Sequence, residues 1–165
     1  MADIAGRLRM SCHLEPVSRA AAALISALHE ACFPEDPWSG SAIDEVMGIP
    51  GFFGQIACQE GSPAGFVLAL YLGDECEILS LGVVPEKRRA GIASMLLHSV
   101  CVAARLRGAT SVTLEVAEDN TTACALYAKQ GFTKVGRRRH YYNRTRNVID
   151  ALILRRVVVT AEPAI

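Results

Sequence analysis

A change of hydrophobic period at residues 81–93 is the feature that most limits what this chain can fold into. Apolar residues run almost continuously up to Val84, as in a buried strand, and from Gly91 onward they recur at helical spacing. The turn between the two patterns is rich in small residues, with Ala90, Gly91 and Ala93 close together. The sequence therefore predicts a strand that passes through a tight turn into a long helix.

The small residues of this turn allow backbone amides to approach an anion closely. Free amides at a helix N-terminus, together with the positive end of the helix dipole, bind phosphate groups, and nearby arginines can add charge-assisted hydrogen bonds. Nucleotide hydrolysis and dinucleotide binding have little support, because the chain has no G-x-x-x-x-G-K-[ST] sequence and no G-x-G-x-x-G after its first predicted strand. The alternative to a phosphate site is a solvated basic turn in front of an ordinary helix. The predicted ligand-binding residues of the turn are Arg88, Arg89, Ala90, Gly91, Ile92, Ala93 and Ser94.

The composition indicates one globular domain of ordinary size. The 165 residues are 51% hydrophobic, and 17 Lys and Arg balance 17 Asp and Glu. A chain of this length can bury most of its apolar surface in one core, and its hydrophobicity lies far from that of disordered chains. We expect a single domain over residues 1–165, with 1–12 as an extension and 158–165 as a tail. The balanced charge argues against broad electrostatic binding to nucleic acid.

Six widely spaced cysteines indicate reduced thiols rather than a zinc site. The sequence has no C-x-x-C pair, and none of its 4 histidines is spaced to complete a zinc site with them. No apolar segment approaches the roughly 18 residues of a membrane span, and the first residues lack the apolar stretch of a signal peptide. We therefore expect a cytoplasmic protein with no metal and no membrane partner.

Periodicity and turn residues divide the rest of the chain into helices and strands. Apolar residues at helical spacing predict helices, and short apolar runs between glycine-containing turns predict an antiparallel meander. The expected order is α-α-β-β-β-α-β-α-β-β, which makes the chain an α/β protein of the mixed α+β kind. The helices are expected at 17–33, 39–47, 91–106 and 121–130, and the strands at 52–58, 64–71, 76–84, 111–116, 132–135 and 148–159.

The strand-to-helix turn also carries a family signature. Arg88-x-x-Gly91-x-Ala93 matches the Q/R-x-x-G-x-G/A sequence of the GNAT acetyltransferases, at the junction where that family binds the pyrophosphate of acetyl-CoA. The chain resembles this family, and the resemblance implies acetyl-CoA as co-substrate. It also implies the GNAT fold, a central mixed, mostly antiparallel sheet flanked by helices. The backbone groups that it implies for the pantetheine arm of the cofactor belong to Leu81, Gly82 and Val83.

The C-terminal half narrows the resemblance to the bacterial ribosomal-protein-alanine N-acetyltransferases, the RimI-type enzymes. The similar stretches are Leu114-Glu115-Val116 with Asn120, Ala125-Leu126-Tyr127-x-x-x-Gly131-Phe132, and Arg138-Arg139-His140-Tyr141-Tyr142. A loop around Trp38 is similar to the Phe-Pro-Trp-Ser stretch of this subgroup, although Glu35-Asp36-Pro37 is inserted in it. The resemblance implies a protein N-terminus as acceptor, with the N-terminal alanine of a small-subunit ribosomal protein as the expected one.

Acetyl transfer to an amine requires a base, because an α-amine is mostly protonated near neutral pH. Glu115 is the leading candidate, since its strand is otherwise apolar and the RimI-type enzymes have a Glu there; a surface-facing Glu is the alternative. Glu77 is a rival base on the strand at 76–84. The resemblance implies that Tyr127 protonates the leaving thiolate, against the alternative of an ordinary core tyrosine. Asn120 is expected to cap the following helix, and the resemblance implies that it also bonds the pantetheine or phosphate arm of the cofactor.

Two further functions remain open at the level of sequence. The chain can be a GNAT acetyltransferase of a small-molecule amine or of another protein N-terminus, an alternative that the altered Phe-Pro loop leaves open. It can also be a CoA-sensing module without turnover. The presence of both Glu115 and Tyr127 argues against the sensing module.

Overall fold

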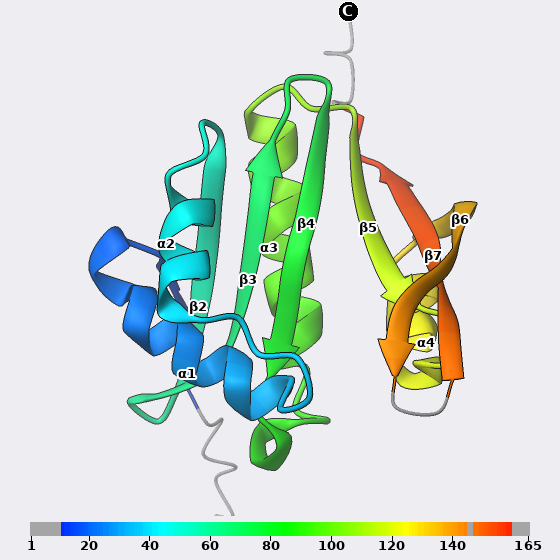
Figure 1. The fold of residues 1–165 in the computed structure, drawn as a ribbon. Helices are drawn as coiled ribbons and strands as arrows, with labels where there is room; N and C mark the ends of the chain where they lie inside the picture. The colour runs from blue at the N-terminus through cyan, green and yellow to red at the C-terminus, as the bar shows by residue number, and fades with distance from the viewer. Residues whose placement is uncertain (1–10, 145–146, 160–165) are drawn as a thin grey trace, which may run out of the picture.

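A seven-stranded sheet with helices on both faces organises the structure, a computed structural model that describes residues 11–144 and 147–159 (Figure 1). The strand order is β1-β2-β3-β4-β5-β7-β6, and only β4 and β5 are parallel neighbours. The expected mixed, mostly antiparallel sheet is thus confirmed. The strands are β1 (Cys12–Pro16), β2 (Phe52–Gln59), β3 (Ser62–Tyr71), β4 (Glu75–Val83), β5 (Ser111–Ala117), β6 (Thr133–Arg144) and β7 (Asn147–Val157). The helices are α1 (Ala22–Cys32), α2 (Gly40–Met47), α3 (Ile92–Leu106) and α4 (Thr121–Lys129), with short 3-10 turns η1 (Arg19–Ala21) and η2 (Pro85–Lys87).

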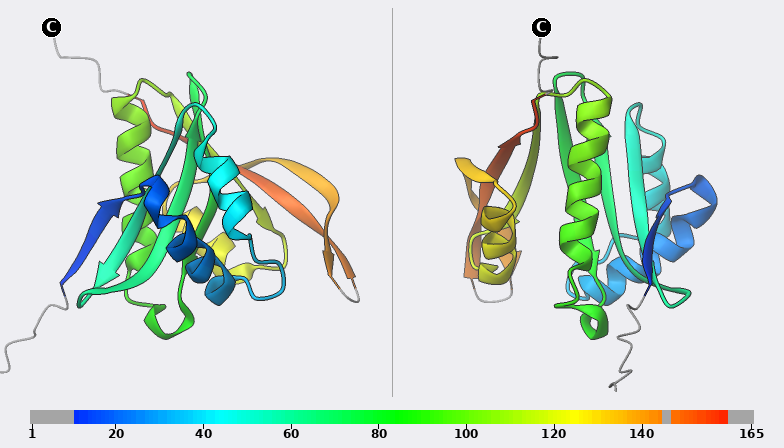
Figure 2. Two further views of the ribbon diagram at one scale, coloured as in Figure 1. Left: turned by 60° about the vertical axis from the view of Figure 1, so that its left-hand side comes forward. Right: turned by 180° about the vertical axis from the view of Figure 1, so that it is seen from behind.

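Two apolar clusters cover the two faces of the sheet. Helices α1 and α2 lie on one face and α3 and α4 on the other, as the views from two further sides show (Figure 2). Because successive strand residues point to opposite faces, Phe66 and Leu68 of β3 pack with α1 and α2, whereas Val67 and Ala69 pack in the cluster that contains α3. Strand β3 is therefore buried on both faces in the middle of the sheet. Within the described residues, no helix is long and apolar enough to span a membrane.

Strands β4 and β5 diverge halfway along their length. Their last paired residues are Ile78 and Leu114, and a β-bulge follows at once, because Ile78 pairs with Ala69 of β3 while Ser80 pairs with Leu68. A bulge bends its strand and increases the local twist. Beyond Ile78, β4 keeps β3 on one side and separates from β5 on the other, as the lower half of Figure 1 shows.

The first strand, β1, was absent from the sequence-based prediction, which placed residues 1–12 in an extension. Residues Cys12 to Pro16 pair with β2 along its outer edge, from Cys12 opposite Gln59 to Pro16 opposite Gln55. The segment is short and ends in proline, so it lacks the sequence pattern of a strand and depends on its partner for its conformation. Residues 1–10 of that predicted extension lie outside the described part of the chain.

The C-terminal hairpin is longer than predicted. The strand expected at 132–135 runs instead over Thr133–Arg144, and it pairs with β7 through two register shifts. The predicted tail at 158–165 begins later, since Val158 is buried and its amide donates to Thr110 O at 2.8 Å. Residues 160–165 lie outside the described residues.

Candidate active site

The N-terminus of α3 presents unused backbone amides. Gly91 caps the helix with φ +80°, and no side chain caps this end. The first intrahelical bond runs from Met95 N to Gly91 O, so in the described chain the amides of Ile92, Ala93 and Ser94 have no acceptor. A Cβ atom added at Gly91 would meet nothing within 4 Å. The predicted phosphate turn therefore has the open backbone geometry that an anion requires.

The two arginines of this turn have different surroundings. Arg88 Nε donates to Val83 O at 2.9 Å, which ties the turn to the end of β4. Part of its guanidinium is thus engaged within the protein, and the charge-assisted bond to phosphate that the sequence predicts for Arg88 stays a prediction. Arg89 is exposed and has a positive φ of 64°, next to the exposed Ala90.

The end of β4 lies beside the divergence from β5. Leu81, Gly82 and Val83 pair with β3 on one side, and they come after the last residue of β4 that pairs with β5. A Cβ atom at Gly82 would lie 2.9 Å from Cys32 Cβ and 3.0 Å from Phe66 Cε1. The packing of α1 on the sheet thus requires a glycine at this position, and the close approach of the cofactor that the sequence predicts stays a prediction.

Glu115 lies at the divergence, on the α1 and α2 side of the sheet. Its neighbours Leu114 and Val116 are buried in the cluster on the opposite side, so the strand alternation places Glu115 on the other face. Its side chain is 20% exposed, and Oε1 lies 2.8 Å from Nε of Arg138 on β6. The surroundings are therefore less apolar than the sequence of β5 implies.

Glu77, the rival base, is close to Glu115. Burial raises the pKa of Glu77; the negative charges of Glu115 and Glu75 act in the same direction, and Arg138 opposes them. Glu77 pairs with Thr113 in the parallel register of β4 and β5, which places it on the same face as Glu115. The two candidate bases therefore form one acidic group.

Tyr127 and Asn120 lie on or beside α4, on the opposite side of the sheet. Tyr127 is 8% exposed, packs edge-on against Phe132 and belongs to the cluster that contains Val116. Burial raises the pKa of Tyr127 to about 12, and Tyr142 and Cys124 act in the same direction. Asn120 caps α4, since its side chain accepts from Ala123 N at 3.1 Å, as predicted. The candidate acid and the candidate base thus lie on opposite faces of β5.

The loop between α1 and α2 is held by a buried histidine that the sequence did not single out for this role. His29 is 3% exposed, and its Nδ1 accepts from Trp38 N at 3.0 Å. The rings of His29 and Trp38 stack at 4.9 Å, and Ser26 Oγ donates to Trp38 O at 3.0 Å. Burial lowers the pKa of His29, with Asp36 opposing, so the imidazole is kept neutral and can accept this bond. The inserted loop therefore has a defined anchor at Trp38.

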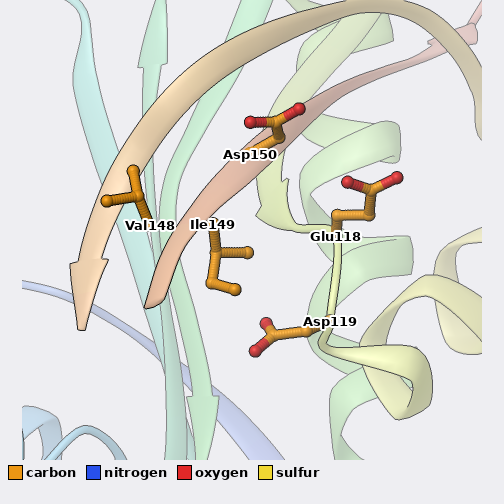
Figure 3. Close-up of a pocket in the computed structure, with 5 residues that line it drawn as sticks. All are labelled: Glu118, Asp119, Val148, Ile149 and Asp150. Carbon is orange, nitrogen blue, oxygen red and sulfur yellow. The ribbon is translucent and has the colours of Figure 1, made fainter. Parts of the chain in front are cut away.

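A pocket of about 280 Å³ lies where β5 ends and β7 begins (Figure 3). Its walls are the side chains labelled in the figure, Glu118, Asp119, Val148, Ile149 and Asp150. Arg137 spans two of its carboxylates, at 2.7 Å from Glu118 Oε2 and 2.9 Å from Asp150 Oδ2. None of the predicted site residues lines this pocket.

One group of side chains meets the spacing of metal ligands, although the sequence indicated none. His13, Glu15 and Cys58 have potential ligand atoms within 4.8 Å of one another. They lie on β1 and β2, at the edge of the sheet farthest in strand order from β6. His13 Nε2 contacts Glu15 Oε1 at 2.9 Å, and both side chains are 57% exposed, so an ordinary surface contact accounts for most of the grouping.

Comparison with known proteins identifies the family. Residues 21–132 match the model of the acetyltransferase (GNAT) family. A ribosomal protein bS18-alanine N-acetyltransferase of Escherichia coli K12 is 31% identical over 118 residues, which cover 72% of this chain and 79% of that protein. The N-alpha-acetyltransferase RimI of Mycobacterium tuberculosis is 35% identical over 112 residues, covering 66% of this chain and 69% of that protein.

The fold agrees with this assignment. The crystal structure of the ribosomal-protein-S18-alanine N-acetyltransferase from Escherichia coli superposes with a TM-score of 0.86 at 24% identity, covering 94% of this chain and 99% of that one. The family match spans α1 to the end of α4, and so includes the amide-rich turn, Glu115 and Tyr127. The chain belongs to the GNAT acetyltransferase family and is an N-acetyltransferase.

Proposed function

We propose that this protein transfers the acetyl group of acetyl-CoA to the α-amine of a protein N-terminus, with the N-terminal alanine of a small-subunit ribosomal protein as its acceptor. The observation that carries the proposal is the position of Glu115 and Tyr127 on opposite faces of β5, beside its divergence from β4. This arrangement lets acceptor and cofactor approach from different sides. The named activity of the Escherichia coli relative supports the choice of the ribosomal alanine, and that of the Mycobacterium tuberculosis relative supports an α-amine.

The proposed reaction is a direct transfer. Glu115 takes a proton from the ammonium group of the acceptor, directly or through water, and the neutral nitrogen attacks the thioester carbonyl. The C–N bond forms, the nitrogen releases its second proton to solvent, and the C–S bond breaks as Tyr127 gives its proton to the departing thiolate. Tyr127 then takes a proton back from solvent, and Glu115 releases the one that it accepted. An amide of the exposed edge of β4, at 81–83, polarises the carbonyl oxygen. No cysteine nucleophile is needed.

The proposed cofactor site is the open turn before α3. The amides of Ile92, Ala93 and Ser94 bind the pyrophosphate, and Arg89 adds charge from the exposed side of the turn. Arg88 contributes by holding the turn against Val83. The whole chain then acts as one catalytic domain. All six cysteines lie in the described residues and are free thiols, which supports a cytoplasmic location.

Gly91→Ala is expected to weaken acetyl-CoA binding by about tenfold, since a non-glycine residue in the left-handed region costs roughly 1–2 kcal/mol and the turn relaxes away from its anion-binding shape. Gly61→Ala is the matched control. Gly61 has φ +77° with nothing within 4 Å of an added Cβ, and it lies in the turn between β2 and β3. Both variants should lose similar stability in urea unfolding, whereas calorimetric titration with acetyl-CoA should detect a change only in Gly91→Ala. Equal affinities of the two variants would contradict the proposed site.

Thiol release from acetyl-CoA tests the acceptor. Four substrates are compared: a peptide with the N-terminus of the ribosomal protein beginning with Ala, its Nα-blocked form, a peptide whose only free amine is a lysine side chain, and a polyamine. We expect release with the free Ala peptide alone. Thiol release with the lysine peptide or the polyamine would contradict the proposed acceptor and leave the assignment to the family unchanged. If no thiol is released with any of the four substrates and CoA still binds tightly, the result would favour a module that senses CoA.

A further inference from the structure

Arg138 reaches across β7 to the candidate base. It pairs with Ala151 of β7, which pairs in turn with Ala117 of β5. Residues paired across antiparallel strands share a face, so Arg138 lies on the face of Glu115, which is two residues before Ala117. The residue between the strands, Ala151, is small and fully buried. The guanidinium can therefore extend over β7 and contact Glu115 Oε1 at 2.8 Å.

The charged groups that act on Glu77, beside Glu115 itself, come from β4 and β6. Glu75 and Glu77 lie on β4, and Arg138 is the cation that faces them. Glu75 also accepts from Thr113 Oγ1 at 2.7 Å. The site thus contains three carboxylates and, among the described residues that influence Glu77, one cation. An acceptor with a positively charged amine has the same charge and the same hydrogen-bonding function as this guanidinium.

Arg138 lies at an exposed and irregular position of the hairpin. The side chain of Arg138 is 56% exposed, and its Cζ atom lies 5.5 Å from the centre of the exposed Tyr141 ring. It is also the last regularly paired residue before a register shift, because the next pair joins Tyr142 to Ile149. His140, within that shift, has a positive φ of 56°. Bulges of this kind redirect side chains beside active sites.

We propose that Arg138 occupies, in the free enzyme, the place at Glu115 that the ammonium group of the acceptor takes on binding. When the acceptor binds, Glu115 therefore exchanges the guanidinium of Arg138 for the ammonium group of the acceptor. Glu115 becomes available as a base only when an acceptor is present. This inference rests on the proposed function. Arg138 is a positioning residue, since it acts through Glu115.

The test compares pH profiles of Arg138→Gln and the wild-type enzyme with the free Ala peptide. In the variant, no cation competes with the acceptor, and KM for the peptide should fall by about threefold, because an ion pair with one exposed partner contributes little. The acid limb of kcat/KM, which reports the free enzyme, should move to higher pH. The acid limb of kcat, which reports the complex, should stay in place.

Two further variants separate this role from a structural one. Arg138→Lys keeps the charge and should restore the wild-type limb of kcat/KM. Arg139→Gln removes the neighbouring, exposed arginine and should leave both limbs and KM unchanged. If the limbs of kcat and kcat/KM move together in Arg138→Gln, the guanidinium stays on Glu115 in the complex and the exchange is wrong. If neither limb moves, Arg138 does not govern Glu115.

The wild-type assay distinguishes this inference from the proposed function. An enzyme that releases no thiol with any of the four acceptors would contradict the proposed function, whatever Arg138 does. An active enzyme with one of the two contrary pH patterns would contradict the exchange alone.

Discussion

Glu115→Gln is expected to lower kcat for the Ala peptide by about 10²- to 10⁴-fold, the usual contribution of a general base. The side-chain amide of the glutamine cannot take a proton from the acceptor at neutral pH. It keeps an oxygen that can accept a hydrogen bond from Arg138, whose Nε lies 2.8 Å from Glu115 Oε1 in the wild-type protein. The site should therefore stay intact. Acetyl-CoA affinity should remain within about twofold, because Glu115 is on the face of β5 opposite Tyr127 and the helices of the proposed cofactor side. Steady-state kinetics and calorimetric titration measure the two effects.

Glu77→Gln is the comparison that decides which carboxylate acts as the base. The raised pKa of Glu77 brings it closer to the value that a base needs, so it is a credible rival on chemical grounds. We expect a smaller loss of kcat for Glu77→Gln than for Glu115→Gln, because removing one negative charge beside Glu115 changes its surroundings without removing the proton acceptor. A wild-type kcat in Glu115→Gln at saturating peptide, with a large loss in Glu77→Gln, would reverse the assignment.

The local parts of the site could be predicted from the sequence. The open turn before α3 is encoded by adjacent small residues, and Gly91 has a positive φ there. Asn120 is a cap because Asn directly precedes a helical pattern, and its side chain accepts from Ala123 N. Each of these features depends on residues within a few positions of one another, so periodicity and motif spacing are sufficient to find them.

The contact between Arg138 and Glu115 could not be predicted in the same way. It depends on three strands that are out of sequence order, since β7 lies between β5 and β6. It also depends on the register of both pairings, and the hairpin changes register twice. A run of arginines such as 137–139 indicates only a basic surface. The structure assigns Arg137 to Glu118 and Asp150, and Arg138 to Glu115.

The fold shows the same division between local and tertiary causes. The predicted helices and the strands at the centre of the sheet have strong periodic patterns, and the structure contains them. Strand β1 has no such pattern, and its conformation comes from pairing with β2. Gly82 is a similar case, because its lack of a side chain is required by Cys32 of α1, fifty positions earlier. Sequence alone shows a glycine there without showing what approaches it.

Tyr127→Phe is expected to lower kcat by about 10²-fold, at the lower end of what a positioned acid contributes. Burial raises the pKa of Tyr127 to about 12, so its hydroxyl holds its proton at every pH at which the enzyme is assayed. The loss of kcat should therefore be constant from neutral pH to about pH 10, the ordinary value for tyrosine. The Tyr127→Phe variant should bind acetyl-CoA with the affinity of the wild-type protein. Tyr71→Phe, on β3 and partly buried, removes a hydroxyl elsewhere and serves as the control.

Turnover measured beside stability separates the acid role of Tyr127 from simple packing. A tyrosine whose pKa is raised in the folded state stabilises the protein fully below its ordinary pKa, and that contribution is lost as the pH rises toward the folded value. For Tyr127 this window extends from about 10 to about 12, and the Phe variant should lack that share of the alkaline loss of stability. If Tyr127 only fills the core beside Phe132, the variant will show this change in stability and a wild-type kcat. A loss of kcat at neutral pH, where both proteins are equally folded, requires the hydroxyl itself in the reaction.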